Sequence, residues 1–336
     1  MNGELPARGE YVHVVCPQCG ADMPEHRLAL VVSAIVTCRR CGQSYVAPRV
    51  SSAHIAHKLQ LWAEQDVVDP ERLNLIGDPS SIAYYARFLA WVERAMALPG
   101  RTILDVGCGT GAFLQVARSA GWSVRGVEIG RASADYAATR LGLDVSQGSF
   151  YPFVAPDGSF DALTMIEVIE HLEHPSQALD KARTLLRPGG VLLVTTPNVD
   201  SLYRRLCGNR WWVINCEDEH IVLFNRRTLS AMLESHGFEV VEVRVCGVDW
   251  LGLMREAVRR LRMGPPGPAM SAGGAVAGYY EARSTKSMVK RMLARTGLLR
   301  LVRLMLRATD RTYAWRWSPT RDWGEQLVVL ARRRPD

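Results

Sequence analysis

The order of hydrophobic and polar residues predicts that strands and helices alternate through the middle of the chain. Short hydrophobic runs are typical of buried strands, and the segments between them have the spacing of amphipathic helices. Such alternation predicts an α/β fold built around a largely parallel sheet. The expected strands are Thr102–Val106, Ser123–Glu128, Phe160–Ile166, Val191–Thr196, Phe238–Val245 and Gln326–Ala331, and the expected helices are Gly111–Ala120, Arg131–Leu141, Ser176–Leu186 and Arg227–Ser235.

Other regions flank this α/β domain, which is expected to span residues 99–245 and 325–336. Residues 1–50 contain paired cysteines and a β-rich stretch, and are expected to form a compact unit of their own. Residues 51–98 have a helical pattern that ends at a Pro-Gly pair. Before the last strand lies an insertion, residues 246–324, with basic helical stretches around a Gly/Pro/Ala-rich linker.

Positive charge is concentrated in that insertion. The 336-residue chain has a formal net charge of +7, with 48% hydrophobic and 22% charged residues, as in an ordinary globular protein. The insertion alone contains thirteen Arg and two Lys against five acidic residues, so the rest of the chain is slightly acidic.

No signal-peptide pattern is visible, and the longest hydrophobic run, Leu28–Val36, is far shorter than a membrane span. The protein is therefore predicted to be cytoplasmic.

A glycine-rich loop after the first α/β strand carries the strongest chemical signal. The sequence ILDVGCGTG places Asp105, Gly107, Gly109 and Gly111 between a strand and a helix. Glycines there let the backbone approach a ligand closely, and Glu128 at the end of the next strand can accept hydrogen bonds from ribose hydroxyls. The G-x-G-x-G spacing differs from the dinucleotide fingerprint. An NAD-type domain, or a glycine turn without a ligand, is the alternative.

Four motifs resemble the class I S-adenosylmethionine-dependent methyltransferases, particularly the ubiquinone-biosynthesis-like small-molecule group. They are LDVGCGTG, VEIG, FDALTMIEVIEHLEHP and LLRPGGVLLVTTPN, and the resemblance covers about residues 80–245. It implies a Rossmann-like seven-stranded sheet whose last strand is antiparallel, with S-adenosylmethionine as cofactor. It also implies cofactor roles for a set of residues: Asp105, Gly107 and Gly109 around the methionine part, Glu128 at the ribose, Ser149 where the family usually has an acidic residue near the adenine, and Ile166 and Glu167 at the cofactor's edge.

Two histidines are the candidate catalytic residues. Methyl transfer to a hydroxyl requires an aligned acceptor and a group that takes its proton. His171 follows the fourth strand, and His220 lies in the loop Asn198–Asn225, which resembles the family's acceptor-facing region and includes Trp211. A structural role, as a helix cap or a core residue, is the alternative for each histidine.

The N-terminal cysteines have the spacing of a zinc site. Cys16, Cys19, Cys38 and Cys41 form two CxxC pairs separated by eighteen residues, each followed by glycine. Four thiolates fill a tetrahedral zinc site and leave no open position, so the zinc is predicted to be structural. Residues 1–50 are thus predicted to be a zinc ribbon that recognises the acceptor, braces the catalytic domain or mediates dimerisation.

The sequence predicts an S-adenosylmethionine-dependent O-methyltransferase acting on a small molecule, such as a sugar, a lipid-linked glycan or a natural-product intermediate. The basic stretch 286–311 has three possible interpretations: a packed helix with solvated arginines, a helix on the inner face of a membrane, or a segment that binds nucleic-acid phosphate. An rRNA or tRNA methyltransferase is therefore the runner-up, and a non-catalytic partner protein that binds S-adenosylmethionine is a third class. The oligomeric state is left open.

Overall fold

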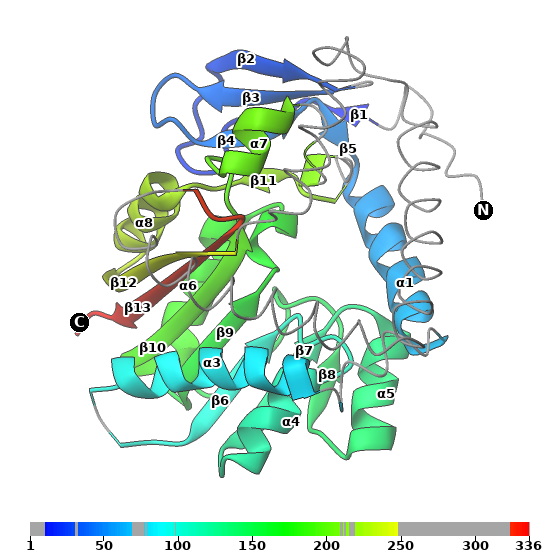
Figure 1. Ribbon diagram of the computed structural model, residues 1–336, viewed down its shortest axis with the longest axis vertical. Helices are drawn as coiled ribbons and strands as arrows, with labels where there is room; N and C mark the ends of the chain where they lie inside the picture. The colour runs from blue at the N-terminus through cyan, green and yellow to red at the C-terminus, as the bar shows by residue number, and fades with distance from the viewer. Residues whose placement is uncertain are drawn as a thin grey trace, which may run out of the picture.

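A computed structural model places two connected parts, a large α/β domain and a smaller β-rich unit above it (Figure 1). The structure describes residues 11–30, 33–68, 77, 79–97, 99–208, 211, 213–214, 219–247 and 323–335. The predicted basic insertion, including residues 286–311, lies almost wholly outside the described residues. Among the described residues, no helix combines the length and the hydrophobicity needed to cross a membrane.

The α/β domain is built on a sheet that has seven strands among the described residues, in the order β12-β13-β10-β9-β6-β7-β8. Strand β13 pairs antiparallel with both β10 and β12, and the other pairings are parallel. The Rossmann-like sheet with an antiparallel last strand is confirmed. Its strands are β6 (Thr102–Val106), β7 (Ser123–Glu128), β8 (Val145–Gln147), β9 (Phe160–Ile166), β10 (Leu186–Pro197), β12 (Phe238–Cys246) and β13 (Gln326–Arg333).

Helices cover both faces of this sheet because its strands are hydrophobic on both sides. Along β6, Leu104 packs into the cluster shared with the helices α6 and α8, whereas Ile103 packs toward α3 and α4. Parallel strands are buried in this way when helices connect them. These helices are α3 (Pro79–Ala95), α4 (Ala112–Ser119), α5 (Arg131–Leu141), α6 (Pro175–Leu185) and α8 (Arg226–Ser235), whereas α7 (Leu202–Cys207) lies near the N-terminal sheet (Figure 1).

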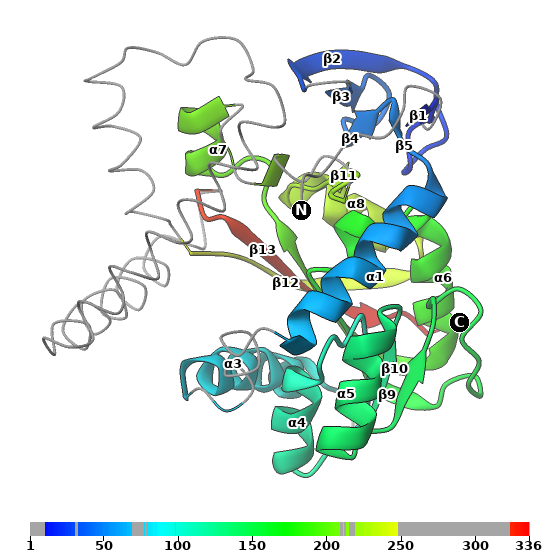
Figure 2. The ribbon, with the colours of Figure 1, turned by 90° about the vertical axis from the view of Figure 1, so that its right-hand side faces the viewer.

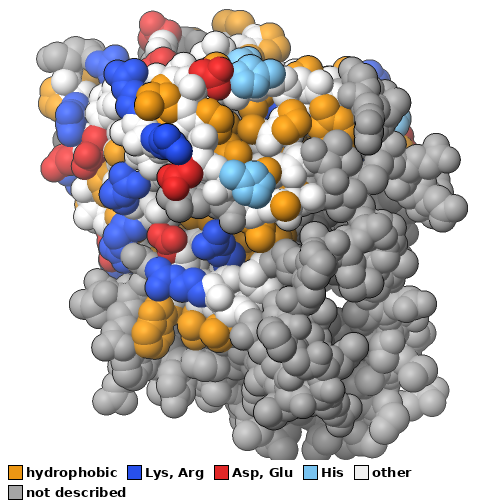
Figure 3. Space-filling model, turned by 90° about the horizontal axis from the view of Figure 1, so that it is seen from above, with side chains coloured by type: hydrophobic (Ala, Val, Ile, Leu, Met, Phe, Trp, Pro, Cys, Tyr) orange, Lys and Arg blue, Asp and Glu red, His pale blue; other side chains and the backbone are white. Residues whose placement is uncertain are grey.

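The N-terminal unit forms a second sheet that includes a strand from the α/β domain. The strands β2 (Pro24–Ala29), β3 (Ala34–Cys38) and β4 (Ser44–Ala47) form an antiparallel meander, and β11 (Val222–Leu223) adds to its edge. A short pair, β1 (Tyr11–Val12) with β5 (Arg49–Val50), lies beside it. Seen from this side, the described surface mixes Lys and Arg with acidic and hydrophobic side chains (Figure 3).

Helix α1 (Ser52–Val68) connects the two parts. It starts beneath the N-terminal sheet and descends across the molecule to α5 (Figure 2). Its Ile55 joins the main core cluster, and near its other end the Ser133 hydroxyl donates to the carbonyl of Ala63. Strand β11 and helix α1 therefore both join the N-terminal unit to the α/β domain.

Candidate active site

The glycine loop after β6 adopts a backbone conformation that requires glycine. Gly107, Gly109 and Gly111 have φ angles of +70°, +53° and +86°, a region that L side chains rarely adopt. A Cβ on Gly107 would lie 2.5 Å from the Val168 Cγ2, and one on Gly111 would lie 2.4 Å from the Leu143 Cδ1. No atom lies within 4 Å of the Cβ position at Gly109, so the loop leaves open space there for a ligand.

This difference predicts unequal effects of alanine at two of the glycines. Gly107→Ala is expected to lower the free energy of unfolding by about 2–4 kcal/mol, because a left-handed φ and a close contact with Val168 add together. Gly109→Ala is expected to lower it by only about 1–2 kcal/mol, because the backbone conformation is its single source of strain. Urea unfolding of the two variants measures the difference. Equal losses would contradict the open space at Gly109.

Two buried carboxylates fix this end of the sheet. The Glu128 carboxylate accepts hydrogen bonds from the amides of Gly109 (2.8 Å) and Gly130 (2.6 Å) and so joins the ends of β6 and β7. The Asp105 carboxylate accepts from the Thr164 hydroxyl at 2.6 Å. Burial raises the pKa of Glu128, and burial together with the charge of Glu128 raises the pKa of Asp105 to about 7. Each Glu128 oxygen keeps a lone pair for a further donor such as a ribose hydroxyl.

Helix α1 forms a wall beside this loop that the sequence did not reveal. The Gln60 side chain donates to the carbonyl of Ile129 (2.7 Å) and accepts from the amide of Arg131 (3.1 Å). A Cβ on Gly130 would lie 2.2 Å from the Ala63 Cβ, so the turn after β7 fits closely under α1. Ser149 follows β8 at the same edge, where its hydroxyl accepts from the amide of Tyr151 at 3.4 Å.

The end of β9 carries a strained glutamate. Glu167 is the one non-glycine residue with a positive φ (56°) among the described residues, and such strain persists at sites where the surroundings enforce it. Its carboxylate accepts from the Thr195 hydroxyl (2.8 Å) and from the Gln326 amide (3.0 Å). The same amide donates to the Tyr84 hydroxyl at 2.6 Å, which brings helix α3 over the site. Ile166 precedes Glu167 and is partly buried in the cluster on the α3 side of the sheet.

His171 and His220 lie against each other although 49 positions separate them in the sequence. Their ring centroids are 4.8 Å apart. The His171 Nδ1 lies 2.9 Å from the carbonyl oxygen of Glu219, and the His220 Nδ1 lies 2.9 Å from that of Val213. Because a carbonyl only accepts, each Nδ1 carries a proton and each Nε2 of the neutral ring offers a lone pair.

Glu170 completes a group of three side chains with these histidines. It is 1% exposed, and neither of its carboxylate oxygens has a hydrogen-bond partner among the described residues. One ligand atom from each of Glu170, His171 and His220 lies within 4.8 Å of the others, which is close enough for one metal ion. Burial, then the charge of Glu167, raises the pKa of Glu170, and burial lowers the pKa of His171 to about 3. We call these three residues the Glu-His-His group.

The predicted site residues therefore meet at the same edge of the sheet. Asp105, the glycine loop, Glu128 and Glu167 lie at the ends of β6, β7 and β9, and the two histidines lie next to them. The described part of the loop Asn198–Asn225 places Trp211 in the core, where its indole donates to the Glu325 carboxylate (2.9 Å). Arg210 and Trp212, which flank Trp211 in this loop, lie outside the described residues. The sequence missed Gln60, Gln326 and the role of Glu170.

Comparison with known proteins decides the family of the α/β part. Residues 82–243 match the family model described as a methyltransferase domain. This part of the chain is a class I methyltransferase domain. The match begins in α3 and ends in β12, and so includes the glycine loop, Glu128 and the Glu-His-His group.

Relatives of the methyltransferase domain are about 30% identical to it over the aligned residues. A ubiquinone biosynthesis O-methyltransferase of Dechloromonas aromatica is 30% identical over 32% of this chain and 49% of that protein. A Mycolicibacterium smegmatis protein named "Probable S-adenosylmethionine-dependent methyltransferase/" is 31% identical over 42% of this chain and 53% of that protein. The chain thus spans about half the length of these relatives. A solved methyltransferase of Thermotoga maritima is 18% identical, with a TM-score of 0.48 over 82% of this chain and all (100%) of that one.

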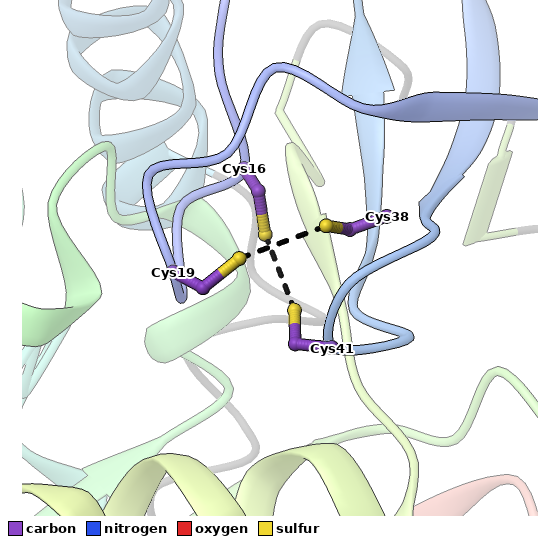
Figure 4. A group of neighbouring side chains, drawn as sticks. All are labelled: Cys16, Cys19, Cys38 and Cys41. Atoms are coloured by element: carbon purple, nitrogen blue, oxygen red, sulfur yellow. Dashed lines mark hydrogen bonds between the residues drawn. The ribbon is translucent and has the colours of Figure 1, made fainter.

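The four paired cysteines point their sulfur atoms at a common centre (Figure 4). The Sγ atoms of Cys16 and Cys41 are 3.5 Å apart, and those of Cys19 and Cys38 are 3.6 Å apart. A tetrahedral zinc ion with Zn–S bonds of about 2.3 Å separates its sulfur ligands by about 3.8 Å. Gly20 and Gly42, which follow the second cysteine of each pair, have φ angles of +68° and +78°. The donor set and the spacing fit zinc.

Proposed function

We propose that this protein transfers the methyl group of S-adenosylmethionine to a hydroxyl group of a small-molecule acceptor. The observation that carries the proposal is the Glu-His-His group, which lies directly after the strained Glu167 at the cofactor edge of the methyltransferase domain. Relatives named ubiquinone biosynthesis O-methyltransferase support oxygen as the methyl acceptor.

The chain's own residues divide the work between cofactor and acceptor. The open glycine loop and Glu128 hold the nucleoside, and Asp105 faces the methionine part, so the methyl group is presented at the ends of β6 and β9. Methyl transfer is an in-line displacement, and the enzyme accelerates it mainly by alignment. The Nε2 lone pair of His220 accepts a hydrogen bond, and then the single proton, from the acceptor hydroxyl as its oxygen takes the methyl group from sulfur. Burial lowers the pKa of His171, so its Nε2 serves as a hydrogen-bond acceptor and not as the base.

The Glu-His-His group also fits a divalent metal ion. Two imidazoles and a carboxylate are a donor set that suits first-row divalent metals. Each histidine directs its Nδ1 proton to a backbone carbonyl, as metal-binding histidines do, and the buried carboxylate of Glu170 has no other partner among the described residues. A bound ion would supply Lewis acidity that lowers the pKa of the acceptor hydroxyl.

For the N-terminal unit we propose a structural zinc ion bound by Cys16, Cys19, Cys38 and Cys41. One tightly held zinc ion per chain is expected by elemental analysis, because structural zinc sites bind with about 10–16 kcal/mol. Cys38→Ser is expected to lose that ion, and limited proteolysis is then expected to cleave within residues 11–47. Cys246→Ser, which removes a cysteine outside the CxxC pairs, serves as the control. Full zinc retention in Cys38→Ser would contradict the assignment.

The acceptor that we propose is a sugar, a lipid-linked glycan or a natural-product intermediate, in the cytoplasm or at the inner face of the membrane. The mixture of charges on the described surface around the N-terminal unit favours such an acceptor over RNA, which proteins bind through basic surfaces (Figure 3). Membrane contact through residues 286–311 remains part of the proposal, and those residues lie outside the described part of the chain.

Two measurements test the proposed function. Calorimetry with S-adenosylhomocysteine is expected to show binding to the purified protein. Radiolabelled S-adenosylmethionine is then offered with catechols, nucleotide sugars, lipid-linked sugars or total RNA, each with and without Mn²⁺ or Zn²⁺. Label is expected in a hydroxyl-bearing small molecule. Transfer to RNA alone would overturn the acceptor class, and absence of cofactor binding would overturn the methyltransferase itself.

A further inference from the structure

The acceptor side of the site is attached to the zinc-binding unit by a strand. His220 is followed at once by Ile221 and then by β11, which is the edge strand of the N-terminal sheet. Leu223 pairs with Ser44 and Val222 pairs with Tyr45, and the amide of Val46 donates to the carbonyl of Ile221 at 3.0 Å. Ser44 lies three positions after Cys41, so a few residues of backbone connect the cysteine cluster with His220.

Buried and polar contacts reinforce this attachment. Gln43 is 0% exposed, and its side-chain amide donates to the carbonyls of Leu223 (2.8 Å) and Ser44 (2.9 Å). From α8, the guanidinium of Arg227 donates to the carbonyl of Cys41 at 3.0 Å. The side chain of Ile35 in β3 packs with Leu223 in one buried cluster. The second cysteine pair is thus held to the segment that carries His220 by hydrogen bonds and by hydrophobic packing.

The same unit also holds the segment that carries His171. Glu173, two positions after His171, accepts from Arg49 (3.0 Å) and from the Ser52 hydroxyl (2.5 Å), where the N-terminal unit passes into α1. Lys58 of α1 forms an ion pair with Glu219 (3.4 Å), a residue with a 3% exposed side chain next to His220. In addition, the amide of Ile221 donates to the carbonyl of Glu170 at 2.9 Å. Both histidines are therefore approached from the N-terminal unit and α1.

Strand β11 depends on these contacts. It is two residues long, and strands that short gain stability only from neighbours that pair with their backbone and bury their side chains. A unit of about 40 residues has too small a core to order itself and typically needs a metal ion. Strand β4 is therefore expected to be ordered only when the cysteine cluster is ordered. Because β4 is the backbone partner of β11, β11 depends on the cluster as well.

We propose that the metal-bound N-terminal unit is a positioning element of the acceptor site: it fixes His220 against His171 through the β4–β11 pairing, with Gln43 as the positioning residue. This inference rests on the function proposed above for the two histidines. It makes the metal at the cysteines a determinant of acceptor geometry, while the glycine loop and Glu128 hold the cofactor independently of it.

The test compares variants that weaken the attachment and keep the four cysteines. Gln43→Met has a side chain of similar size without the amide donor, and Arg227→Ala removes an exposed side chain that contacts Cys41. His13→Ala is the matched control, because His13 lies on the same unit but pairs with Asp22 at the exposed surface. Each variant is examined for zinc content, for S-adenosylhomocysteine affinity, for amide exchange over residues 219–224 and for the ¹⁵N shifts of histidine ring nitrogens.

Gln43→Met is expected to retain one zinc ion and to bind S-adenosylhomocysteine within about twofold of the wild type. Amide exchange over residues 221–224 is expected to accelerate at least about tenfold, because a lost buried hydrogen bond to Leu223 destabilises the pairing. The ring shifts of His171 and His220 are expected to move in this variant and in Arg227→Ala, and to stay unchanged in His13→Ala.

Unchanged exchange and unchanged histidine shifts in both attachment variants would overturn the proposal. If Gln43→Met also lowers cofactor affinity, the substitution perturbs the whole domain. The exchange rates and histidine shifts of Arg227→Ala, which changes an exposed side chain, then decide whether the proposal holds. None of these measurements requires methyl transfer. If the protein binds no cofactor, the proposed function is refuted, but the exchange and ring-shift measurements still test the positioning role. If those measurements show no effect of the attachment variants, the proposed function is unaffected.

Discussion

Glu128→Ala is expected to lower the affinity for S-adenosylhomocysteine by at least about 100-fold. Hydrogen bonds to charged groups contribute about 1.5–3 kcal/mol each, and every 1.4 kcal/mol changes an affinity tenfold. The substitution removes the proposed bonds to the two ribose hydroxyls. It also releases the amides of Gly109 and Gly130, which the carboxylate holds at 2.8 and 2.6 Å. Calorimetry on the purified variant measures the loss.

Two further variants show whether the loss of affinity is specific to the Glu128 carboxylate. Asp135→Asn removes an exposed acid from the following helix, α5, and is expected to leave the affinity unchanged. Glu128→Gln keeps the length of the side chain but loses the charge and one acceptor, and should fall between the wild type and Glu128→Ala. An affinity of Glu128→Ala within about threefold of the wild type would show that the cofactor's sugar lies elsewhere.

Glu170→Gln is expected to lower kcat by about 10²–10⁴-fold, because it removes the carboxylate ligand of the proposed metal ion and so weakens the assistance to proton transfer at the acceptor hydroxyl, while affinity for S-adenosylhomocysteine stays within about threefold. A second effect has the opposite sign. Burial raises the pKa of Glu170, so near neutral pH the metal-free protein must either bury that charge or take up a proton on folding, and a neutral glutamine avoids this cost. The metal-free variant is therefore expected to unfold at the same temperature as the metal-free wild type or at a higher one.

Unfolding measurements without an acceptor test metal binding by Glu170 separately from methyl transfer. Adding Mn²⁺ or Co²⁺ at about 100 times its dissociation constant stabilises a protein by about 2.7 kcal/mol, and this gain is expected for the wild type and not for Glu170→Gln. Glu234→Gln, which changes an exposed acid on α8, is the control and should keep the gain. A gain of equal size in both variants would place the ion elsewhere.

The sequence predicted the methyltransferase sheet well because each strand carries its own signal. The runs Thr102–Val106 and Phe160–Ile166 are hydrophobic enough to be recognised alone, and the structure places β6 and β9 at the same residues. Strand β8 was missed because it has only three residues, Val-Ser-Gln, at the edge of the sheet. None of the three is buried, so they form no hydrophobic pattern. Strand β11 was missed for a different reason: its partner β4 is about 180 positions away, and no local pattern encodes that pairing.

The same limit applies to the site. The glycine loop and Glu128 could be predicted as a candidate cofactor site because these residues follow one another closely along the chain. That His171 touches His220, and that Glu170 faces both, depends on how a loop returns to the sheet. Gln60 gave no signal at all. Its role comes from the packing of α1 against the turn at Ile129, which only the folded chain brings together.

Helix α1 has a consequence for how such an enzyme diversifies. At one end of the helix the Ser52 hydroxyl donates to Glu173, two positions after His171, and at the other Gln60 and Ala63 contact the turn and helix that follow the proposed ribose ligand Glu128. With a rise of about 1.5 Å per residue, the eight residues from Ser52 to Gln60 span about 12 Å. The N-terminal unit and this helix thus form one module that contacts both the proposed acceptor side and the proposed cofactor side of the site. Replacing this module as a unit would therefore change the acceptor side and the turn at Ile129 together.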